Sequence, residues 1–332
     1  MVKFLVVRFS SIGDIILTTP VVRHLKKQVD QAEIHYLTKE VHATLLEANP
    51  YIHRVHAFTG DMRSCIRELR KEGIDFVIDL HHNTRSARVK YGLRRIDFSV
   101  RKLNVLKWLY VNLRVNRLPA IHMVDRNMET IRTFIHEQDQ EGLDYFIPAG
   151  EEVPMTDLPA EFRNGYVAMA IGAMHGTKKL PVESLVLLAG KLSHSVILLG
   201  GPGDRETGDA IVAGLPGRPV LNGCGTYSIH QSASLVKQCK VLITHDTGMM
   251  HAGAAFRKKI ITVWGSTVPA FGMYPYRPGA GSINFEVKDL SCRPCSKIGY
   301  QKCPRKHFRC MLEQDLDLIA STAGHLAGTT SE

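Results

Sequence analysis

Two short polar segments, each directly after an apolar run, carry the residues best suited to chemistry. The first follows Val2–Val7 and reads Arg-Phe-Ser-Ser-Ile-Gly-Asp over residues 8–14. Gly13 permits a tight turn, and Asp14 would stand at the start of a helix at the mouth of a ligand cleft. Asp14 could instead do no more than cap the helix that begins there. The residues alone leave both roles open.

The second segment also follows an apolar run and reads His-Asp-Thr-Gly-Met-Met-His over residues 245–251. At the start of a helix, backbone amides such as those of Thr247 and Gly248 bind phosphate groups. Asp246 and His251 add polar side chains, so we predict that this turn binds a ligand. The small residues that follow are better explained by close packing of the helix on a sheet: Gly253, Ala254 and Ala255.

Two further polar turns fit a nucleotide ligand. Residues 200–206 read Gly-Gly-Pro-Gly-Asp-Arg-Glu, and their carboxylates could bind a ribose. They lack the Gly-x-Gly-x-x-Gly pattern of nicotinamide dinucleotide sites, which argues against a dehydrogenase. Residues 175–181 place Lys178 and Lys179 before a helix. These lysines could neutralise a diphosphate, although solvated surface lysines are common.

The elements that must position these turns alternate between strand and helix patterns. Continuous apolar strands separated by helices are typical of α/β proteins with parallel sheets, in which ligands bind beyond the carboxyl ends of the strands. The strands that we expect are residues 2–7, 34–37, 76–80, 166–171, 196–199, 241–244 and 260–264. The helices that we expect include residues 61–71, 181–191, 205–213 and 229–238.

Length and charge narrow the class of protein. At 332 residues the chain exceeds the size at which one core usually stops growing, so we expect two domains with a Pro-rich hinge over residues 148–159. The net charge of +10 favours an anionic partner. Arg8 interrupts the N-terminal apolar run, and no stretch reaches the roughly 18 apolar residues that span a bilayer. We therefore expect a cytoplasmic protein.

A basic segment runs from Arg85 to Arg117, with ten Lys or Arg residues and one acid, Asp97. Trp108, Tyr110 and three leucines are interleaved with this charge. Such a basic amphipathic segment can settle on anionic lipid, or it can be a solvated helix packed on its domain. Both explanations remain open. A nucleic-acid site is not favoured, since the aromatic residues form no stacking platform on strands.

As a set, these motifs resemble glycosyltransferase family 9, the ADP-heptose:lipopolysaccharide heptosyltransferases, over essentially the whole chain. The resemblance rests on the Arg-x-Ser-x-x-Gly-Asp start, on Lys178-x-Leu180-Pro181 and on Gly-Gly-Pro-x-Asp-x-Glu at residues 200–206. It rests also on Asp246-Thr247-Gly248-x-x-His251 and on the Trp-Gly-Ser-Thr turn at residues 264–267. Leu180 stands where the family usually has an aromatic residue, and Ser266 where it often has proline.

The resemblance implies a GT-B fold, in which two Rossmann-like domains with parallel sheets face a central cleft. Residues 1–155 would form the acceptor-binding domain and residues 156–312 the nucleotide-sugar-binding domain. The helix expected in residues 313–332 would pack back on the first domain. The implied partners are an ADP-sugar donor and an anionic, lipid-linked glycan acceptor at the inner face of the inner membrane, bound peripherally by a monomeric enzyme.

The implied reaction is an inverting, metal-independent transfer of heptose from ADP-heptose to the inner core of lipopolysaccharide. In that reaction Asp14 would be the general base. The residues expected to bind the donor are Lys178, Glu206, Asp246, Thr247, Gly248 and His251. The residues expected to bind the acceptor are Ser10, Gly13, Arg85 and Arg126. Another nucleotide sugar, a nucleotide-dependent oxidoreductase and a non-catalytic sugar- or lipid-binding protein are the alternatives.

Four of the seven cysteines crowd into one segment: Cys292, Cys295, Cys303 and Cys310. Four thiolates could hold a structural zinc ion, but these spacings are irregular for a zinc ribbon or finger. We favour reduced packing cysteines over zinc, and we expect neither a cofactor nor a catalytic metal.

Overall fold

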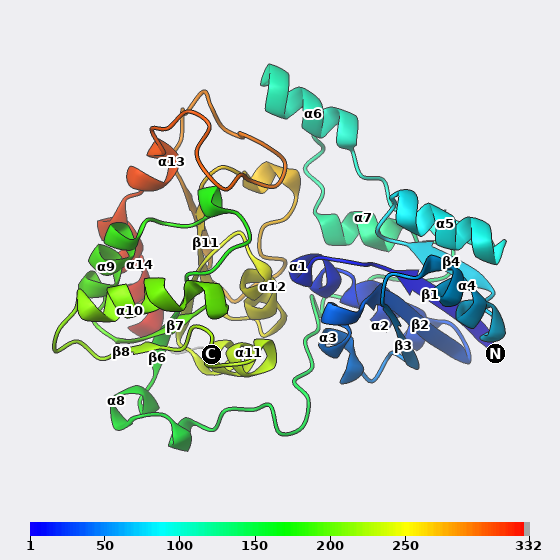
Figure 1. Ribbon diagram of the computed structural model, residues 1–332, viewed down its shortest axis with the longest axis horizontal. Coiled ribbons are helices and arrows are strands. Elements are labelled where there is room, and N and C mark those ends of the chain that lie inside the picture. The colour runs from blue at the N-terminus through cyan, green and yellow to red at the C-terminus, as the bar shows by residue number, and fades with distance from the viewer. Residues whose placement is uncertain (329–332) are drawn as a thin grey trace. The chain divides into compact units, whose positions relative to one another are not determined.

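A computed structural model describes residues 1–328 of the chain, which form two compact units (Figure 1). Unit 1 comprises residues 1–103 and 121–148. Unit 2 comprises residues 104–120 and the chain from residue 149 onward. The chain passes into the second domain close to the start of the expected hinge, and it also enters that domain once before, for the short stretch 104–120.

Unit 1 is built on a five-stranded sheet in which every observed strand pair is parallel. The strands are β1 (Val2–Val7), β2 (Ala32–Lys39), β3 (Arg54–Phe58), β4 (Phe76–Asp79) and β5 (Ile96–Ser99). The helices are α1 (Ile12–Ile16), α2 (Thr19–Gln28), α3 (Thr44–Glu47), α4 (Met62–Lys71), α5 (Thr84–Leu93) and α7 (Met123–Glu129). The strand order β3-β2-β1-β4-β5 reverses direction between β1 and β4, which is where ligands bind in doubly wound sheets.

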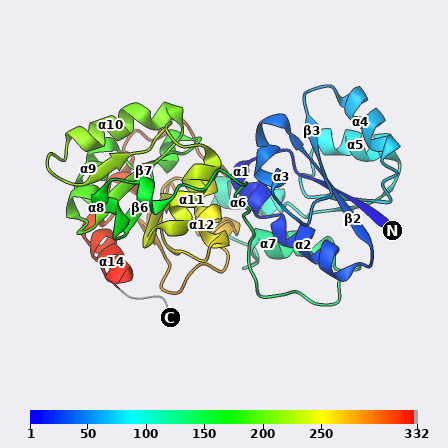
Figure 2. The same ribbon diagram turned by 90° about the horizontal axis from the view of Figure 1, so that it is seen from below.

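Helices cover both faces of the unit 1 sheet. Figure 2 shows α4 and α5 on one face and α2 and α7 on the other. This explains why β1 reads as a continuous apolar run: Phe4 to Val7 are all fully buried, with no solvent-facing alternation. Met62 and Leu69 of α4 and Val89 of α5 join β1 in the core on their face.

Unit 2 repeats this architecture with a six-stranded parallel sheet. The strands are β6 (Tyr166–Ala170), β7 (Ser195–Leu199), β8 (Val220–Asn222), β9 (Val241–His245), β10 (Lys259–Trp264) and β11 (Ile283–Glu286). The helices are α6 (Asn104–Leu113), α8 (Ala160–Arg163), α9 (Val182–Lys191), α10 (Arg205–Ala213), α11 (Ile229–Gln238), α12 (Gly248–Ala255), α13 (Arg309–Leu312) and α14 (Leu316–Gly328). The order β11-β10-β9-β6-β7-β8 reverses between β6 and β9.

Side-chain alternation along the central strands divides the packing of unit 2 between two faces. Val241 and Ile243 of β9 pack in the core formed with α9 and α14. Leu242, between them, points to the other face, where a Cβ on Gly253 of α12 would lie only 2.5 Å from its Cδ2 atom. Gly253 and the buried Ala254 therefore serve close helix-to-sheet packing, as the sequence predicted.

The expected strands and helices of both halves are confirmed to within about two residues, and the strands that the sequence analysis missed share a position. They are β3, β5, β8 and β11, the four edge strands of the two sheets. An edge strand has a partner on one side only and carries more polar residues. In β11, for example, Ile283 is 43% exposed, so these strands lack the continuous apolar run that marks the central ones.

Two expectations about the domains can be compared with the division into units. The C-terminal helix is expected to pack back on the first domain, and α14 contributes Ile319, Ala323 and Leu326 to the core of unit 2, where its apolar side meets α9. The basic segment from Arg85 to Arg117 is divided between the units, since α5 and β5 belong to unit 1 and α6 to unit 2. Among residues 1–328, no helix is both long and apolar enough to cross a membrane.

Candidate functional site

Asp14 lies at the carboxyl end of β1, on the first turn of α1, and makes an ion pair. Its Oδ1 atom lies 2.6 Å from Nη2 of Arg8. Its Oδ2 atom accepts hydrogen bonds from the Ser11 amide at 3.1 Å and the Ser11 hydroxyl at 2.8 Å. Asp14 is therefore the third residue of a capping box whose N-cap is Ser11. The capping role that the sequence left open is realised in the geometry, and a charged partner is added to it.

The surroundings of Asp14 keep it ionised. Burial alone would raise the pKa of this carboxyl group, but the Arg8 charge and the hydrogen bonds from Ser11 outweigh burial and lower the pKa to about 2. Arg8 is itself held in place, since its Nε donates to the Ser10 carbonyl at 2.9 Å and its Nη1 to the Leu80 carbonyl at 2.5 Å. Arg8 thus joins the ends of β1 and β4, the two strands at the switch point of unit 1.

The turn after β4 adds a half-buried imidazole, that of His81, beside Arg8. Asp79 is fully buried and accepts hydrogen bonds from the amides of His81 and His82 and from the Ser86 hydroxyl. Burial, together with the charges of Arg8 and Lys102, lowers the pKa of His81 to about 4. His81 is therefore neutral at physiological pH, and its Nδ1 atom has no hydrogen-bond partner in the described part of the chain.

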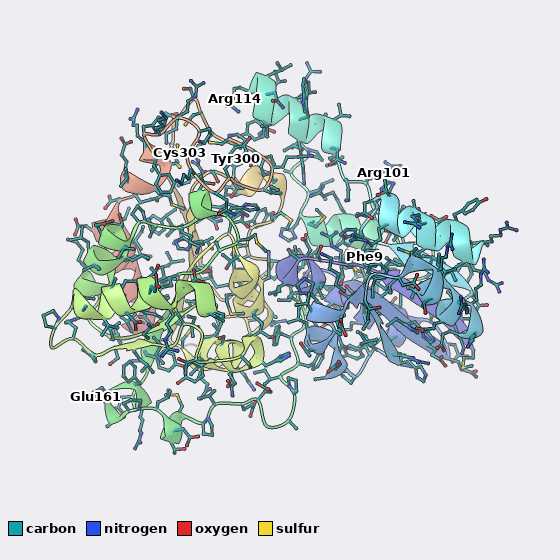
Figure 3. The ribbon with its side chains drawn as sticks, in the orientation of Figure 1. Phe9, Arg101, Arg114, Glu161, Tyr300 and Cys303 are labelled. Carbon is teal, nitrogen blue, oxygen red and sulfur yellow. The ribbon has the colours of Figure 1, made fainter. Side chains whose placement is uncertain are left out.

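The residues expected to bind the acceptor lie in unit 1. Gly13 is buried and Ser10 is half-buried in the turn beside Asp14. The guanidinium group of Arg85 lies over the Phe9 ring, 5.2 Å from its centroid (Phe9 is labelled in Figure 3). Arg126 lies on α7 and is only 8% exposed, and burial lowers its pKa. The structure thus brings Arg85 close to the turn after β1 and buries Arg126 within the unit.

In unit 2, two expected residues, Lys178 and Asp246, meet a third, Thr267, at the carboxyl ends of the central strands. Lys178 Nζ lies 2.6 Å from Asp246 Oδ2, and the Thr267 hydroxyl donates to the same oxygen at 2.9 Å. These residues come from the turns after β6, β9 and β10. A lysine and a threonine held this way form a polar cluster beside the switch point, where a diphosphate would sit in a sheet of this order.

The amino end of α12 adds backbone donors to this cluster. Thr247 is its N-cap residue in extended conformation, and Asp246 to Met249 are only half-buried, so the first amides of the helix are accessible. His251 lies one turn further and is 2% exposed. A partly exposed helix start beside a lysine has the chemistry of a phosphate site.

His245 ties two of these turns together, although the sequence analysis gave it no role. Its Nε2 atom accepts a hydrogen bond from the Leu180 amide at 3.0 Å, which links the end of β9 to the loop carrying Lys178. Burial and the charge of Lys179 lower its pKa to about 4, so the ring stays neutral and keeps this acceptor.

The Gly-Gly-Pro turn after β7 holds a carboxylate close to the backbone. Asp204 accepts from the Gly201 amide at 3.0 Å and pairs with Lys179 at 2.5 Å. A Cβ on Gly172 would lie 2.3 Å from Asp204 Oδ2, so a larger residue there would displace this carboxylate. Glu206 is exposed in the first turn of α10 and reaches solvent.

The cysteine-rich segment holds the backbone of the donor-side turns in place. The sequence analysis did not predict this role. Arg293 donates from Nε to the Gly265 carbonyl at 2.5 Å and from Nη2 to the Thr267 carbonyl at 2.9 Å. Thr177 lies next to Lys178, and its amide donates to the Tyr300 carbonyl at 2.9 Å. The Thr177 hydroxyl oxygen accepts a hydrogen bond from the Tyr300 amide at 2.8 Å. A single arginine among many basic residues gives no sequence signal for this role.

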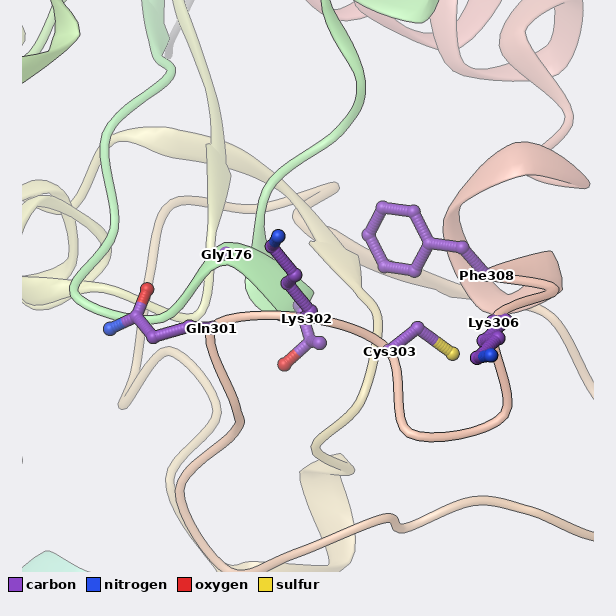
Figure 4. Close-up of a pocket in the computed structure, with 7 residues that line it drawn as sticks. Gly176, Gln301, Lys302, Cys303, Lys306 and Phe308 are labelled. Atoms are coloured by element: carbon purple, nitrogen blue, oxygen red, sulfur yellow. The ribbon is translucent and has the colours of Figure 1, made fainter.

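The four clustered cysteines carry free thiols. In the described part of the chain, no group of three or more His, Cys, Asp or Glu side chains is arranged to hold a metal ion. Burial raises the pKa of Cys295 to about 11 and of Cys310 to about 12. Cys303 lines a pocket of about 410 Å³ between residues 176–177 and the loop carrying Lys302, Lys306 and Phe308 (Figure 4).

The chain is similar to known proteins in sequence and in fold. The sequence matches the family model of glycosyltransferase family 9 (heptosyltransferase) over residues 62–302. Lipopolysaccharide heptosyltransferase 2 of Salmonella typhimurium is 24% identical over 301 residues, which cover 81% of this chain and 84% of that protein. The solved E. coli ADP-heptose lps heptosyltransferase II has a TM-score of 0.75, with 19% identity and 98% of each chain covered. E. coli heptosyltransferase WaaC with ADP has a TM-score of 0.64, with 22% identity, covering 85% of this chain and 92% of its own.

Proposed function

The chain belongs to glycosyltransferase family 9 and has the GT-B fold of its solved relatives, and from this membership we propose an inverting, metal-independent transfer of heptose from ADP-heptose to the inner core of lipopolysaccharide. Unit 2 binds the donor, and unit 1 supplies the base and the acceptor site. The observation that carries the proposal is the pair of polar turns at the two switch points, one around Asp14 and one around Asp246.

The donor assignment rests on the polar cluster of unit 2. The ammonium group of Lys178 and the first amides of α12 supply positive charge for a diphosphate. These fixed groups can stabilise the charge that develops on the leaving diphosphate without a divalent ion. Thr247, Gly248 and His251 complete the phosphate and sugar contacts, and Glu206 takes the ribose hydroxyls. The relative solved with ADP supports adenine as the base.

The chemical step follows from the carboxylate of unit 1. The acceptor hydroxyl oxygen attacks the anomeric carbon from the face opposite the diphosphate, a new C–O bond forms, and the bond to the phosphate oxygen breaks with its electron pair on ADP. Asp14 accepts the hydroxyl proton. Because its pKa is about 2, Asp14 is ready as a base throughout the neutral range.

The acceptor side follows the relatives, whose names place their reaction on lipopolysaccharide. We assign Ser10, Gly13, Arg85 and Arg126 to the acceptor, because arginines suit the acidic groups of an anionic glycan. A lipid-linked acceptor lies at the cytoplasmic face of the inner membrane, so the enzyme works as a peripheral protein there.

Replacing Asp14 by Asn tests the proposal. Asn keeps the size and much of the capping capacity of Asp but leaves Arg8 without its ion-pair partner. Turnover should therefore fall by about 10²-fold or more, the melting temperature should fall with the loss of the pair, and ADP affinity should change little. The assay follows ADP release with heptose-acceptor lipid, and a thermal-shift panel compares ADP with UDP and GDP.

Asp61→Asn is the matched control, since Asp61 also accepts a helix-start amide, from Arg63 at 2.9 Å, and has no proposed role. An Asp14→Asn enzyme within a few-fold of wild-type turnover would remove Asp14 from the mechanism, and His81 would be the next base to test. Clearly better protection by UDP or GDP than by ADP would overturn the donor assignment.

A further inference from the structure

Helix α6 leaves its apolar side chains unburied. It contains seven aliphatic or aromatic residues among ten, yet none of its residues is buried. Val105 is 71% exposed, Trp108 54% and Leu113 57%. Exposing a tryptophan and large aliphatic side chains on one short helix is costly in water, so this helix face is built to meet another surface.

The helix is nevertheless fixed to unit 2. Arg114, directly after α6, donates from Nε to the Ser291 carbonyl and from Nη1 to the Pro294 carbonyl, both at 2.8 Å. Tyr110 packs edge-on against Phe271, with ring centroids 6.0 Å apart. The outward-facing side of α6 is therefore held next to the loop of residues 290–308.

The loop of residues 290–308 also exposes large apolar side chains. Ile298 is 61% exposed and Tyr300 45%, and Figure 3 shows Arg114, Tyr300 and Cys303 at the same end of unit 2. Its exposed basic residues are Lys297, Lys302, Arg305 and Lys306. No acid occurs between Asp289 and Glu313, and none between Asp97 and Asp125.

We propose that α6 and the 290–308 loop together form a membrane-docking surface that binds an anionic lipid bilayer, with Trp108, Leu113 and Ile298 entering the interface and the loop lysines meeting lipid phosphates. The inference rests on and deepens the proposed function, because a lipid-linked acceptor is presented at such a bilayer.

Charge and shape favour a bilayer over other partners. A surface of one charge sign with scattered aliphatic and aromatic side chains matches the interfacial region of anionic lipid. The pocket lined by Phe308, Lys302 and Lys306 has an apolar wall and two ammonium groups, which suits a phospholipid headgroup and the start of its chain. Nucleic acid would need aromatic side chains arranged for base stacking, and the exposed side chains of α6 are mainly aliphatic.

The test is binding of the full-length protein to vesicles of phosphatidylcholine with and without phosphatidylglycerol, at low and high salt. Wild type should bind the anionic vesicles preferentially, and less at high salt because the attraction is screened. Lys302→Gln/Lys306→Gln should weaken binding by roughly fivefold per charge at low salt. Trp108→Ser should weaken it by about tenfold at both salt concentrations.

Matched controls lie elsewhere on unit 2. Leu318→Ser removes a side chain that is 53% exposed on α14, and Lys191→Gln/Lys237→Gln removes two charges from surface ion pairs on α9 and α11. Both controls should bind vesicles as wild type does, and all variants should keep the wild-type melting temperature and ADP affinity.

Unchanged vesicle binding in both Lys302→Gln/Lys306→Gln and Trp108→Ser would overturn the proposed surface. Equal affinity for duplex DNA, or a dimer that Trp108→Ser dissociates, would overturn it as well. If the wild-type protein bound ADP but not anionic vesicles, the membrane-docking surface would be wrong and the proposed function would stand. If it bound vesicles but not ADP, the proposed function would be wrong and the docking surface would stand.

Discussion

At the scale of single residues, the pairing of Arg8 with Asp14 sets the chemistry of unit 1. The ion pair at 2.6 Å overrides burial and holds the pKa of Asp14 near 2. A carboxylate with so low a pKa is always ionised in the cell but is a weak base, since general bases work best with a pKa near the working pH. Arg8 therefore makes Asp14 a weaker base but keeps its carboxylate ionised and fixed in position.

Replacing Arg8 by Gln should make turnover depend on pH in the mildly acidic range. Without the Arg8 charge, the raising effect of burial remains, so the pKa of Asp14 rises and the protonated form accumulates as pH falls. Wild type should show no acid limb from Asp14 down to about pH 4, because its pKa is about 2. The test is to measure turnover against pH for wild type and Arg8→Gln, at pH values above the one at which each enzyme unfolds. A variant profile that overlays the wild-type profile would contradict this account.

At the scale of elements, the strand-to-helix turns of unit 2 act through one buried contact. His245 at the end of β9 accepts from the Leu180 amide, which fixes the loop before α9 that carries Lys178. Since burial and the Lys179 charge keep His245 neutral, this contact persists through the neutral range. A ligand contact made by Lys178 thus depends on a residue that never touches the ligand.

His245→Ala should weaken ADP binding more than it weakens the fold. It leaves the Leu180 amide unsatisfied, which costs about 1–3 kcal/mol of stability, and frees the Lys178 loop. Calorimetry with ADP and urea unfolding measure the two effects. His230→Ala, in the buried part of α11, is the control: it should lose stability with ADP affinity retained. Equal loss of ADP affinity in both variants would assign His245 a purely structural role.

The elements also show what the sequence could and could not predict. Central strands such as β1 and β9 are buried on both faces, so their continuous apolar runs predicted them. The edge strands could not be predicted in this way, because their polar residues face solvent and interrupt the apolar run. Lys178 and Asp246 were both expected at the donor site, but they lie 68 residues apart and only the sheet order brings them together. Arg293 could not be found, because what it binds is backbone carbonyls, which every sequence has.

At the scale of the whole molecule, one buried arginine joins distant parts of unit 1. In unit 1, Arg23 of α2 is fully buried and pairs with Asp139 in two hydrogen bonds of 2.9 and 3.0 Å and with Asp144. It also donates to the Gly142 carbonyl at 2.9 Å. One buried guanidinium group thereby holds the last segment of unit 1 against α2 before the chain leaves for unit 2.

Arg23→Met should destabilise the protein by about 3–5 kcal/mol, the usual cost of breaking a buried pair and leaving its carboxylates behind. Lys27→Met on the same helix is the control: its contact with Glu141 at 3.3 Å is largely exposed and should contribute less than about 1 kcal/mol. Urea unfolding of the three proteins makes the comparison. Similar midpoints for the two variants would show that the buried network adds little.

The early excursion of residues 104–120 into unit 2 bears on how such a protein can recombine. A crossover in the linker near residue 149 looks like a clean boundary between halves, yet it would join the α6 of one parent to the 290–308 loop of another. The backbone carbonyls that accept hydrogen bonds from Arg114, and the Phe271 ring that packs against Tyr110, would then come from a different parent than α6 itself. Exchanging donor halves between relatives therefore requires residues 104–120 to be inherited together with the chain from residue 149 onward.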